Sequence, residues 1–399
     1  MKKMEEIKNH VFCGNCLDVM AEFPDNSIDS IVTDPPYGLK FMGKKWDHGV
    51  PGIPFWEEAL RVVKPGAHML AFGGTRTYHR VTTAIEDAGW EIRDCMMWIY
   101  GSGWPKSHDV KKAIEKDTPE EAEEWDGWGT ALKPAYEPIV IARKPLDGTI
   151  AQNVLTWGCG GINIDGCRIP FPADDNALEE GIKRAAKPRV DFRNGHFHAG
   201  ADCSKTNIVE TSMTPLGRWP ANIILDEEAG RLLDEQSGYD CGNKAPVSPG
   251  IRGKSKGVYG DYAQKGCNPL TFRGDTGGAS RFFYCAKASR KERGEGKDHP
   301  TVKPLALIQY LIRLITPPKG ITLDMFAGSG THAEAALNEN VKYVCIELLP
   351  ENTKKIENRI KHHKMVNKLD IIENSEGATI IKCMSEIQTG ILDYGGEKA

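Results

Sequence analysis

One stretch near the C-terminal end decides the fold: residues 321–331 read Ile-Thr-Leu-Asp-Met-Phe-Ala-Gly-Ser-Gly-Thr. An apolar run that includes Asp324 is followed by two glycines and then by a segment with helical spacing, which predicts a buried strand, a turn and a helix. Gly328 and Gly330 let a ligand approach the backbone closely at the positive end of that helix. Glu347, 23 positions after Asp324 at the tip of the next predicted strand, can hydrogen-bond ribose hydroxyls. These features predict a nucleoside-cofactor site.

The glycine turn differs from two common phosphate-binding turns. It lacks the third glycine of the dinucleotide fingerprint, and it has no Gly-Lys-Thr or Gly-Lys-Ser of the P-loop, which argues against NAD and against a nucleoside triphosphate. A Gly-x-Gly turn alone is weak support for a cofactor site, because many α/β connections contain one. The acidic residue at the end of the following strand strengthens the prediction.

The alternation of strands and helices extends to both sides of this stretch. We predict strands at Ser27–Thr33, His68–Phe72, Ala221–Leu225, Ile321–Phe326 and Lys342–Ile346. We predict helices at Phe55–Val63, Leu305–Ile315, Thr331–Asn340 and Pro350–His363. Lys64, Pro65 and Gly66 are expected to form a turn. Strands that alternate with helices favour a parallel sheet, so the sequence predicts the α/β class.

A second motif, Thr33-Asp34-Pro35-Pro36-Tyr37-Gly38, directly follows the first predicted strand. Two successive prolines favour an extended, rigid loop, which here lies at the carboxyl edge of the sheet, where α/β sites are found. The loop holds a carboxylate, a carbonyl and an aromatic ring together. Asp34 and the Pro35 carbonyl can accept hydrogen bonds from an amino group, while Tyr37 can stack on the attached ring. The alternative is a surface turn with an exposed tyrosine.

The Asp34 to Tyr37 motif resembles the DPPY catalytic signature of amino-group DNA methyltransferases. Asp324 to Gly330 is similar to their S-adenosylmethionine motif, and the order of the two motifs is that of the β class. Further stretches with the same resemblance are Val11–Asp18, Arg61–Phe72 and His299–Pro304. Asn15 departs from the pattern, because this position often carries Asp, which puts an acidic contact from it in doubt.

The resemblance implies a circularly permuted, Rossmann-like methyltransferase sheet with an inserted target-recognition lobe. It assigns residues 1–144 to the catalytic half, 145–293 to target recognition and 294–365 to the cofactor half, and it leaves the tail, 366–399, without a role. It implies Asp34, Pro35, Pro36 and Tyr37 as catalytic residues. The implied cofactor-binding residues are Asp324, Phe326, Gly328, Gly330, Thr331, Glu347 and Lys303.

The implied reaction is transfer of a methyl group from S-adenosylmethionine to an exocyclic amine of a base that is flipped out of duplex DNA. Within the family, Asp at the first motif position is associated mostly with adenine and Ser with cytosine, so Asp34 favours the 6-amino group of adenine. The alternatives are the 4-amino group of cytosine, RNA, a protein glutamine, or a catalytically silent DNA-binding protein. None of the eleven Cys follows a Pro, which disfavours carbon-5 chemistry on cytosine. The resemblance leaves open a homodimer and a cognate restriction nuclease.

The charge of the whole chain, −4, does not favour a polyanion partner, and the distribution of the charge is more informative than its sum. Residues 244–297 contain twelve Lys or Arg and four acids, a local balance of +8 in a glycine-rich stretch. A solvated loop and a phosphate-binding surface are equally compatible with this run. The basic residues expected to contact double-stranded DNA are Lys44, Lys45, Arg252, Lys254, Lys256, Arg273, Arg281, Lys287, Arg290, Lys291 and Arg293. Phe282, Phe283 and Tyr284 are interpreted as core residues of a strand.

The composition excludes several classes of protein. With 399 residues, 40% apolar and 27% charged, the chain has the balance of a globular protein with a large core. No apolar run reaches the ~18 residues of a membrane span, and no leader is apparent, so we expect a cytoplasmic protein of bacterial, phage or prophage type. Cys13 and Cys16 have zinc-like spacing without a second pair, and His196 and His198 lack a third ligand, so no metal site is expected.

Overall fold

The computed structural model places most of the two α/β stretches and part of the middle lobe. It describes residues 2–39, 49–103, 105, 107–171, 189–190, 208–209, 217–238, 256–257, 260–261, 277–286 and 302–375. The chain forms two compact units, the first made of 1–93, 140–161 and 290–399, the second of 94–139 and 162–289. The domain boundaries expected from the sequence, at 144 and 293, remain a prediction. These units differ from them in grouping 94–139 with the middle of the chain.

The first unit is built on parallel strands, as the sequence predicts. Five of its strands lie in the order β1-β13-β12-β2-β3, and every pair of neighbours among them is parallel. They are β1 (His10–Cys13), β13 (Lys342–Glu347), β12 (Ile321–Asp324), β2 (Ile28–Thr33) and β3 (Val63–Phe72). Because the strands are parallel, their carboxyl ends meet at one edge of the sheet. Two strands far apart in the sequence, β2 and β12, are therefore direct neighbours.

Strand β2 is buried along its whole length, and its polar side chains have partners. Asp29 accepts hydrogen bonds from the Ile321 backbone N–H at 2.7 Å and from Lys64 Nζ at 2.6 Å. The Ser30 and Thr316 hydroxyls are hydrogen-bonded at 2.8 Å. A buried polar group without such partners would be destabilising, so these bonds help to fix β2 in the centre of the sheet.

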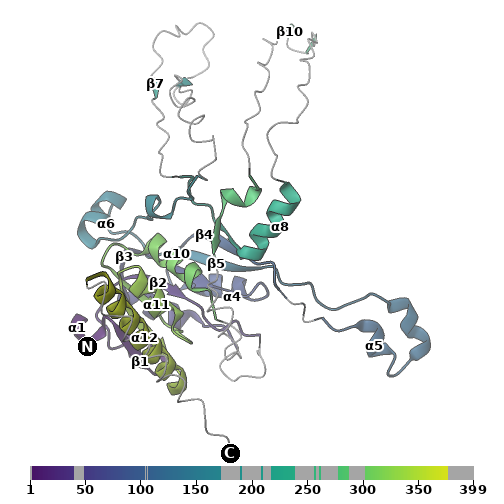
Figure 1. The fold of residues 1–399 in the computed structure, drawn as a ribbon, viewed down its shortest axis with the longest axis horizontal. Helices are drawn as coiled ribbons and strands as arrows, with labels where there is room; N and C mark the ends of the chain where they lie inside the picture. Colours follow the sequence, from purple (N-terminus) through teal and green to yellow (C-terminus); the bar gives the residue numbers. More distant parts are fainter. Residues whose placement is uncertain are drawn as a thin grey trace, which may run out of the picture. The chain divides into compact units, whose positions relative to one another are not determined.

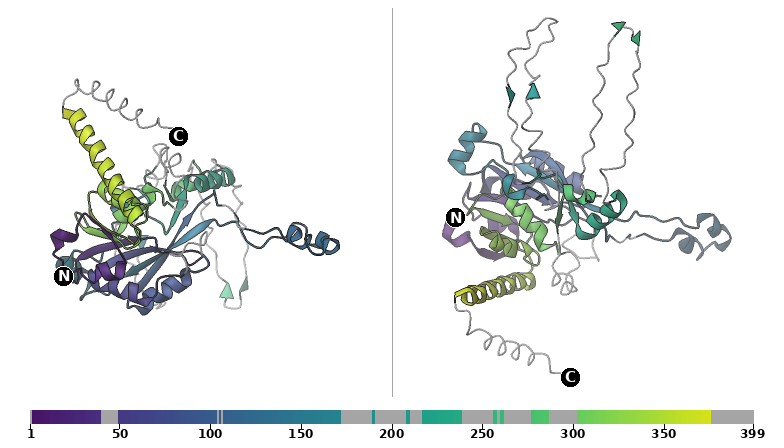
Figure 2. Two further views of the ribbon diagram at one scale, coloured as in Figure 1. Left: turned by 90° about the horizontal axis from the view of Figure 1, so that it is seen from below. Right: turned by 45° about the horizontal axis from the view of Figure 1, so that its top comes forward.

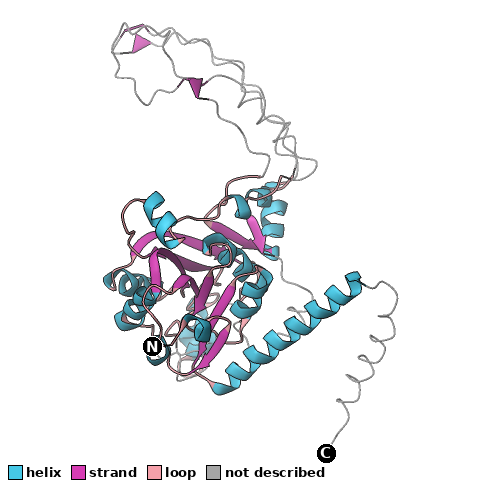
Figure 3. Ribbon diagram, turned by 90° about the vertical axis from the view of Figure 1, so that its left-hand side faces the viewer, coloured by secondary structure: helices cyan, strands magenta, loops and turns pink. Residues whose placement is uncertain are grey.

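Helices cover both faces of this sheet, with β2 and β12 in the middle layer (Figures 1 and 2). One layer consists of α10 (Leu305–Ile315), α11 (Thr331–Asn338) and α12 (Pro350–Ser375), and the other contains α2 (Cys16–Met20), α3 (Ile53–Val62) and α4 (Tyr78–Asp87). Within the described residues, the first unit also contains α1 (Met4–Ile7) and α6 (Ile150–Trp157). Figure 3 shows α12 as a long helix, which continues past its predicted end at His363.

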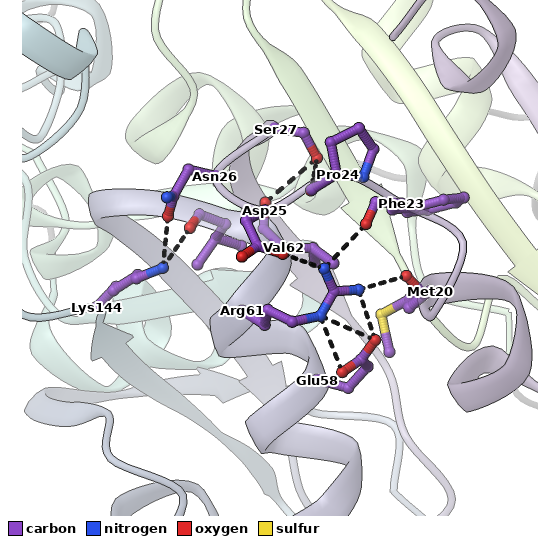
Figure 4. Close-up of polar contacts among 11 residues, drawn as sticks. Met20, Phe23, Pro24, Asp25, Asn26, Ser27, Glu58, Arg61, Val62 and Lys144 are labelled. Atoms are coloured by element: carbon purple, nitrogen blue, oxygen red, sulfur yellow. Dashed lines mark hydrogen bonds and ion pairs between the residues drawn. The ribbon is translucent and has the colours of Figure 1, made fainter. Parts of the chain in front are cut away.

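The start of β2 is held by an arginine network that Figure 4 shows. Arg61 on α3 donates to the carbonyls of Met20 at 2.7 Å and Phe23 at 2.9 Å, and it pairs with Glu58 and Asp25. A guanidinium can serve several acceptors at once because its five N–H donors form a fixed fork. The network therefore fixes the loop that precedes β2. Strand β2 leads to the Asp34 motif at its other end.

The second unit contains a shorter parallel arrangement. Strand β8 (Ile223–Asp226) pairs in parallel with β4 (Glu91–Ile99) and with β11 (Tyr284–Ala286). Strands β4 and β5 (Tyr136–Arg143) each have residues in both units. The part of this unit that the structure describes also contains α5 (Val110–Ile114), η3 (Pro119–Trp125), η4 (Asp165–Cys167), α8 (Glu227–Ser237), η6 (Ala279–Phe282) and the short strand pairs β6 (Arg189–Val190) with β7 (Ile208–Val209) and β9 (Lys256–Gly257) with β10 (Gly260–Asp261).

Two local predictions are wrong. The expected turn at residues 64–66 lies within β3, where the register of the β2–β3 pairing shifts, and the Gly66 N–H and the Pro65 carbonyl are hydrogen-bonded to the Lys144 carbonyl and the Asn153 side chain. Phe282 belongs to a 3-10 helix and is 42% exposed, so it is not a core residue of a strand. Among the described helices, none combines the length and the apolar character that crossing a membrane requires.

Candidate active site

The Asp34 loop leaves the carboxyl end of β2, as the sequence predicts. Asp34 is partly exposed, and Pro35 behind it is buried. The Tyr37 hydroxyl donates a hydrogen bond to Asp34 Oδ1 at 2.9 Å. The carboxylate and the aromatic side chain of the motif are thus held together within four residues of chain.

Lys303 brings a positive charge to this pair from the segment before α10. Its Nζ donates to Asp34 Oδ2 at 2.6 Å and lies 3.2 Å from the Tyr37 hydroxyl. It also lies over the rings of Tyr37 and Phe72, 5.4 and 4.8 Å from their centroids. Lys303 is nearly buried, so its charge acts on the carboxylate with little screening by water. The structure places this predicted cofactor residue on the Asp34 motif.

The backbone of Tyr37 is fixed by residues that follow β3. Thr77 Oγ1 donates to the Tyr37 carbonyl at 2.7 Å. A Cβ added at Gly74 would lie 3.1 Å from the Tyr37 ring, so only a glycine fits there without displacing the ring. The position of the ring therefore depends on a close contact between two loops at the same sheet edge.

The glycine turn connects β12 to α11, and its two glycines have different surroundings. Both have positive φ, +53° at Gly328 and +86° at Gly330, a region that side chains disfavour. A Cβ at Gly330 would lie 2.9 Å from the side chain of Ile356 on α12, whereas a Cβ at Gly328 would meet no atom nearer than 4.0 Å. Gly330 is thus required for packing, and Gly328 keeps a space open at the start of α11.

Glu347 ends β13 and holds the turn from the neighbouring strand. Its Oε2 accepts from the Gly328 N–H at 2.8 Å, and its Oε1 accepts from the Leu349 N–H at 3.0 Å and from Asn352 Nδ2 at 3.2 Å. The carboxylate is buried and accepts these bonds at fixed positions, and Oε2, which accepts only one of them, has a second lone pair. It can therefore both order the turn and accept a ligand hydroxyl.

The two motifs are joined by one buried hydrogen bond. Thr33 Oγ1, one residue before Asp34, donates to Asp324 Oδ1 at 2.7 Å, and the same oxygen accepts from the Phe326 N–H at 3.0 Å. Burial raises the pKa of Asp324 to about 7, while the bonds from Thr33 and Phe326 act in the opposite direction. Segments about 290 positions apart thus meet at one edge of the sheet.

The remaining predicted cofactor residues also lie around this turn. Phe326 is partly buried, and its ring lies 6.2 Å from that of Phe55 on α3. Thr331 begins α11, and its hydroxyl accepts a hydrogen bond from Arg359 of α12 at 3.2 Å. Asn15 acts as the N-cap of α2, where its side chain accepts from the Leu17 N–H at 3.0 Å.

Most residues expected to contact DNA lie outside the described residues. They are Lys44, Lys45, Arg252, Lys254, Arg273, Lys287, Arg290, Lys291 and Arg293. Lys256 is placed only as backbone in β9, and Arg281 lies in η6. His196 and His198 also fall outside. Within the ranges that the structure describes, no three His, Cys, Asp or Glu side chains form a group that could hold a metal ion, and Cys13 is exposed whereas Cys16 is buried.

Sequence reasoning missed four residues that shape the site: Thr33, Phe72, Gly74 and Thr77. Thr33 and Phe72 end strands whose carboxyl edge was already expected to carry the site, and Gly74 with its preceding glycine directly follows β3. The sequence therefore shows that these residues stand at or just after the ends of strands, but it does not show which residues they contact.

Comparisons with known proteins agree with these features. A family described as DNA methylase matches residues 28–358 of the chain. The chain is similar to the type II methyltransferase M.HindIII of Haemophilus influenzae, with 29% identity over 201 residues, and the match covers 38% of this chain and 64% of that protein. It is also similar to M.HpaI of Haemophilus parainfluenzae, with 30% identity over 108 residues, 24% of this chain and 33% of that protein. The matches thus span less than two thirds of these relatives.

Among solved structures, the chain is similar to that of the PvuII DNA methyltransferase, which is described as cytosine-N4-specific. The match covers 88% of this chain and 85% of that one, with 13% sequence identity and a TM-score of 0.42.

Proposed function

Because the chain belongs to the DNA methylase family, we propose that it transfers a methyl group from S-adenosylmethionine to the 6-amino group of adenine in duplex DNA. The observation that carries the proposal is the junction between the two motifs. Thr33 and Asp324 are hydrogen-bonded, so the hydrogen-bond acceptors of the Asp34 loop and the open glycine turn lie at the same sheet edge. A methyl donor and an amine acceptor need such adjacent sites.

The residues of the glycine turn fit a nucleoside-containing cofactor. Gly328 leaves space where any side chain would intrude, and the start of α11 provides backbone N–H groups. Glu347 supplies carboxylate oxygens beside this space, and Phe326 offers a partly exposed ring. S-adenosylmethionine, when bound, supplies an electrophilic methyl group on a sulfonium centre. The role of the chain is to hold the cofactor in one orientation at the edge that carries Asp34.

The Asp34 loop can activate an amine that is a poor nucleophile. The lone pair of an exocyclic amine is delocalised into the base, and hydrogen bonds from its two hydrogens to Asp34 and to the Pro35 carbonyl would localise it. Tyr37 would stack on the base, which must be flipped out of the duplex to reach the loop. Asp34 is also in position to accept the proton that the methylated nitrogen releases.

Lys303 also contacts the Asp34 carboxylate, and this contact affects how an amine can bind there. Asp34 accepts a bond from Tyr37 on one oxygen and from Lys303 on the other. An incoming amine must therefore share or displace one of these donors. We infer that Lys303 acts on the Asp34 motif as a positioning residue.

The choice of adenine rests on Asp34, which is associated with adenine in the resembled class. The alternative acceptor is the 4-amino group of cytosine, whose amine presents the same two hydrogens to the loop. The proposal also includes duplex DNA as the partner, a homodimer, a cognate restriction nuclease and a cytoplasmic location.

The proposal is tested by incubating the protein with labelled S-adenosylmethionine and genomic DNA and digesting the DNA to nucleosides. We expect label in N6-methyladenine. Label in N4-methylcytosine would support the reaction but overturn the choice of base. An absence of label in DNA, with label transferred instead to RNA or protein, would overturn the proposed substrate.

A further inference from the structure

A segment of the second unit, between β4 and β5, forms a small lobe that has no part in the site described above. This acidic lobe comprises residues 107–131 and contains α5 and η3, which pack against each other. Its two ends are joined by backbone pairing, because Asp109 bridges Gly129 and the Val110 N–H donates to the Trp128 carbonyl at 3.0 Å. The lobe therefore has a closed backbone that can present side chains at fixed positions.

Two tryptophans at the end of η3 lie at the surface of this lobe. Trp125 is 40% exposed and Trp128 is 61% exposed. Their ring centroids are 5.4 Å apart, and the interplanar angle of 74° gives an edge-to-face contact. The buried residue of η3 is the small Ala122, so the two large rings do not form the core of the lobe. Large apolar side chains that serve only packing are normally buried, so an exposed pair in mutual contact indicates a surface for a partner.

The lobe also carries a strong negative charge. Its 25 residues include eight acids and three Lys, a balance of −5. Lys111 pairs with Glu123 at 2.9 Å and lies 3.8 Å from Asp126, and Lys112 pairs with Asp109 at 3.2 Å. The acids of the lobe that make no ion pair with any described residue are Glu115, Asp117, Glu120, Glu121 and Glu124. Three of these five lie in η3, which also carries Trp125.

The rings and carboxylates together favour a cationic partner. The face of a tryptophan ring attracts a Lys ammonium or an Arg guanidinium more strongly than other aromatic rings do, and it can pack on the apolar stem of the same side chain. A carboxylate beside the ring can pair with the charged end. Duplex DNA does not fit this surface, because its phosphates and the carboxylates of the lobe repel each other.

The number of these groups favours a protein segment over a small cation. The lobe offers two exposed rings and five carboxylates that make no ion pair within the described part of the chain. A small cation can engage only part of this set, whereas a segment with several Lys or Arg side chains can engage it together. Exposed ion pairs contribute little one by one, so the tryptophans are the expected anchor of such a contact.

We propose that the acidic lobe is a docking surface for a Lys- and Arg-rich segment of another protein, in which a cationic side chain lies on Trp128 and its neighbours pair with Glu121 and Glu124. The surface does not depend on the proposed methyl transfer, because none of its residues belongs to the site at the edge of the parallel sheet.

The test measures the binding of a fluorescent synthetic peptide of Lys, Arg and Leu residues to the full-length protein by anisotropy. A peptide with Glu in place of every Lys and Arg is the negative probe. The test variants are Trp128→Ala and the double variant Glu121→Gln/Glu124→Gln. The double variant removes two charges that pair with no described residue, so its fold should be unchanged. Thermal melts show whether each variant is folded.

Each test variant has a matched control. Trp219→Ala removes a tryptophan that is 64% exposed elsewhere in the same unit. Glu86→Gln/Asp87→Asn removes two exposed charges from α4 in the first unit. Both controls should bind the basic peptide as the unmodified protein does.

We expect the unmodified protein to bind the basic peptide and not the acidic one. Trp128→Ala should weaken binding by roughly tenfold, and the double variant by roughly threefold with a smaller salt dependence. Absence of peptide binding by the unmodified protein, or unchanged affinity in folded Trp128→Ala, would overturn the proposal.

Two further measurements identify the occupant. Sedimentation of the protein without peptide should give the same mass for the test variants as for the unmodified protein, and a change would assign the lobe to a second copy of the chain and overturn the proposal. Both test variants should also retain the affinity for duplex DNA, and a loss would overturn the exclusion of DNA. Because neither measurement involves methyl transfer, a protein that binds the peptide but methylates no DNA would contradict the proposed function and support the docking surface.

Discussion

Thr33 donates its hydroxyl proton to Asp324 across 2.7 Å, although the two residues are 291 positions apart in the chain. The bond is possible because β2 and β12 are parallel neighbours, which brings their carboxyl ends to one sheet edge. It connects the loop that carries Asp34 to the turn that carries Gly328. The site therefore depends on the pairing of β2 with β12. A small change at the Thr33–Asp324 bond should affect both motifs.

Replacing Thr33 by Val removes the bond but keeps the shape of the side chain. We expect the free energy of unfolding to fall by about 1 kcal/mol, because a buried hydrogen bond is lost, and methyl transfer to decrease as the motifs lose their common anchor. Ser30→Ala is the control, since Ser30 makes a buried 2.8 Å bond to Thr316 in the same strand, away from the motifs. Equal losses of kcat in the two variants would contradict the role given to the Thr33 bond.

Lys303 gives a second test. The resemblance implies that it binds the cofactor, whereas the structure has its Nζ in contact with Asp34 and Tyr37. If it acts on Asp34 and Tyr37, Lys303→Met should lower kcat by roughly tenfold or more and leave the dissociation constant of the cofactor within about twofold. Lys303→Arg should recover part of the rate. Lys64→Met removes a lysine that pairs with buried Asp29 at the other end of β2, and it should reduce stability alone. A weaker cofactor complex with unchanged kcat would instead assign Lys303 to the cofactor.

Much of the fold could be predicted from the sequence, because its parallel strands are short apolar runs bounded by clear turns. Residues 28–33 and 321–324 are buried throughout, and such runs are readable without knowing their partners. The exception at Lys64-Pro65-Gly66 is instructive. Lys64, Pro65 and Gly66 have the composition of a turn, but they lie within β3 and are hydrogen-bonded to residues 144 and 153. These long-range contacts cannot be read from the local sequence.

The sequence predicts that Asp34, Gly328 and Glu347 lie at the sheet edge, as the structure has them, but it does not predict their partners, and the roles of these residues stay a prediction. Asp34, Gly328 and Glu347 stand at positions where strand ends and turns make a site probable from local pattern alone. The contact of Lys303 with Asp34 joins residues 269 positions apart and depends on how the segment before α10 crosses the sheet edge. The exposed ring of Phe282 was misread because consecutive aromatic residues resemble a core strand, whereas a 3-10 helix turns one of them outward.

Asp324 predicts how stability depends on pH. Burial raises the pKa of Asp324 to about 7 from 3.8, so between these values the folded state binds more protons than the unfolded state. The contribution of this group to the free energy of unfolding should therefore be full at low pH and decrease as the pH rises towards 7. Asp324→Asn should flatten this dependence in urea unfolding measured from about pH 3 to about pH 8, a range that brackets the window from 3.8 to about 7. The exposed control Asp87→Asn should retain it, and an equal slope in both variants would contradict the assignment.

The two glycines of the turn should respond differently to alanine. Gly330→Ala places a Cβ 2.9 Å from Ile356 at φ +86°, so it should lower stability by roughly 2 kcal/mol or more through strain and overpacking. Gly328→Ala meets no atom within 4.0 Å, so it should cost only about 1 kcal/mol but weaken cofactor binding, because the methyl group enters the open space. Thermal melts and cofactor titration separate the two. If a folded Gly328→Ala protein still binds the cofactor tightly, the cofactor does not occupy that space.

The most direct measurement of the central claim is a paired assay on Asp34→Ala, in which cofactor binding is measured by titration and methyl transfer by incorporation of label into duplex DNA. The account predicts an unchanged dissociation constant for S-adenosylmethionine and a rate of transfer reduced by at least about a hundredfold, because the amine loses its acceptor while the glycine turn stays intact. Methyl transfer at the unmodified rate would contradict it.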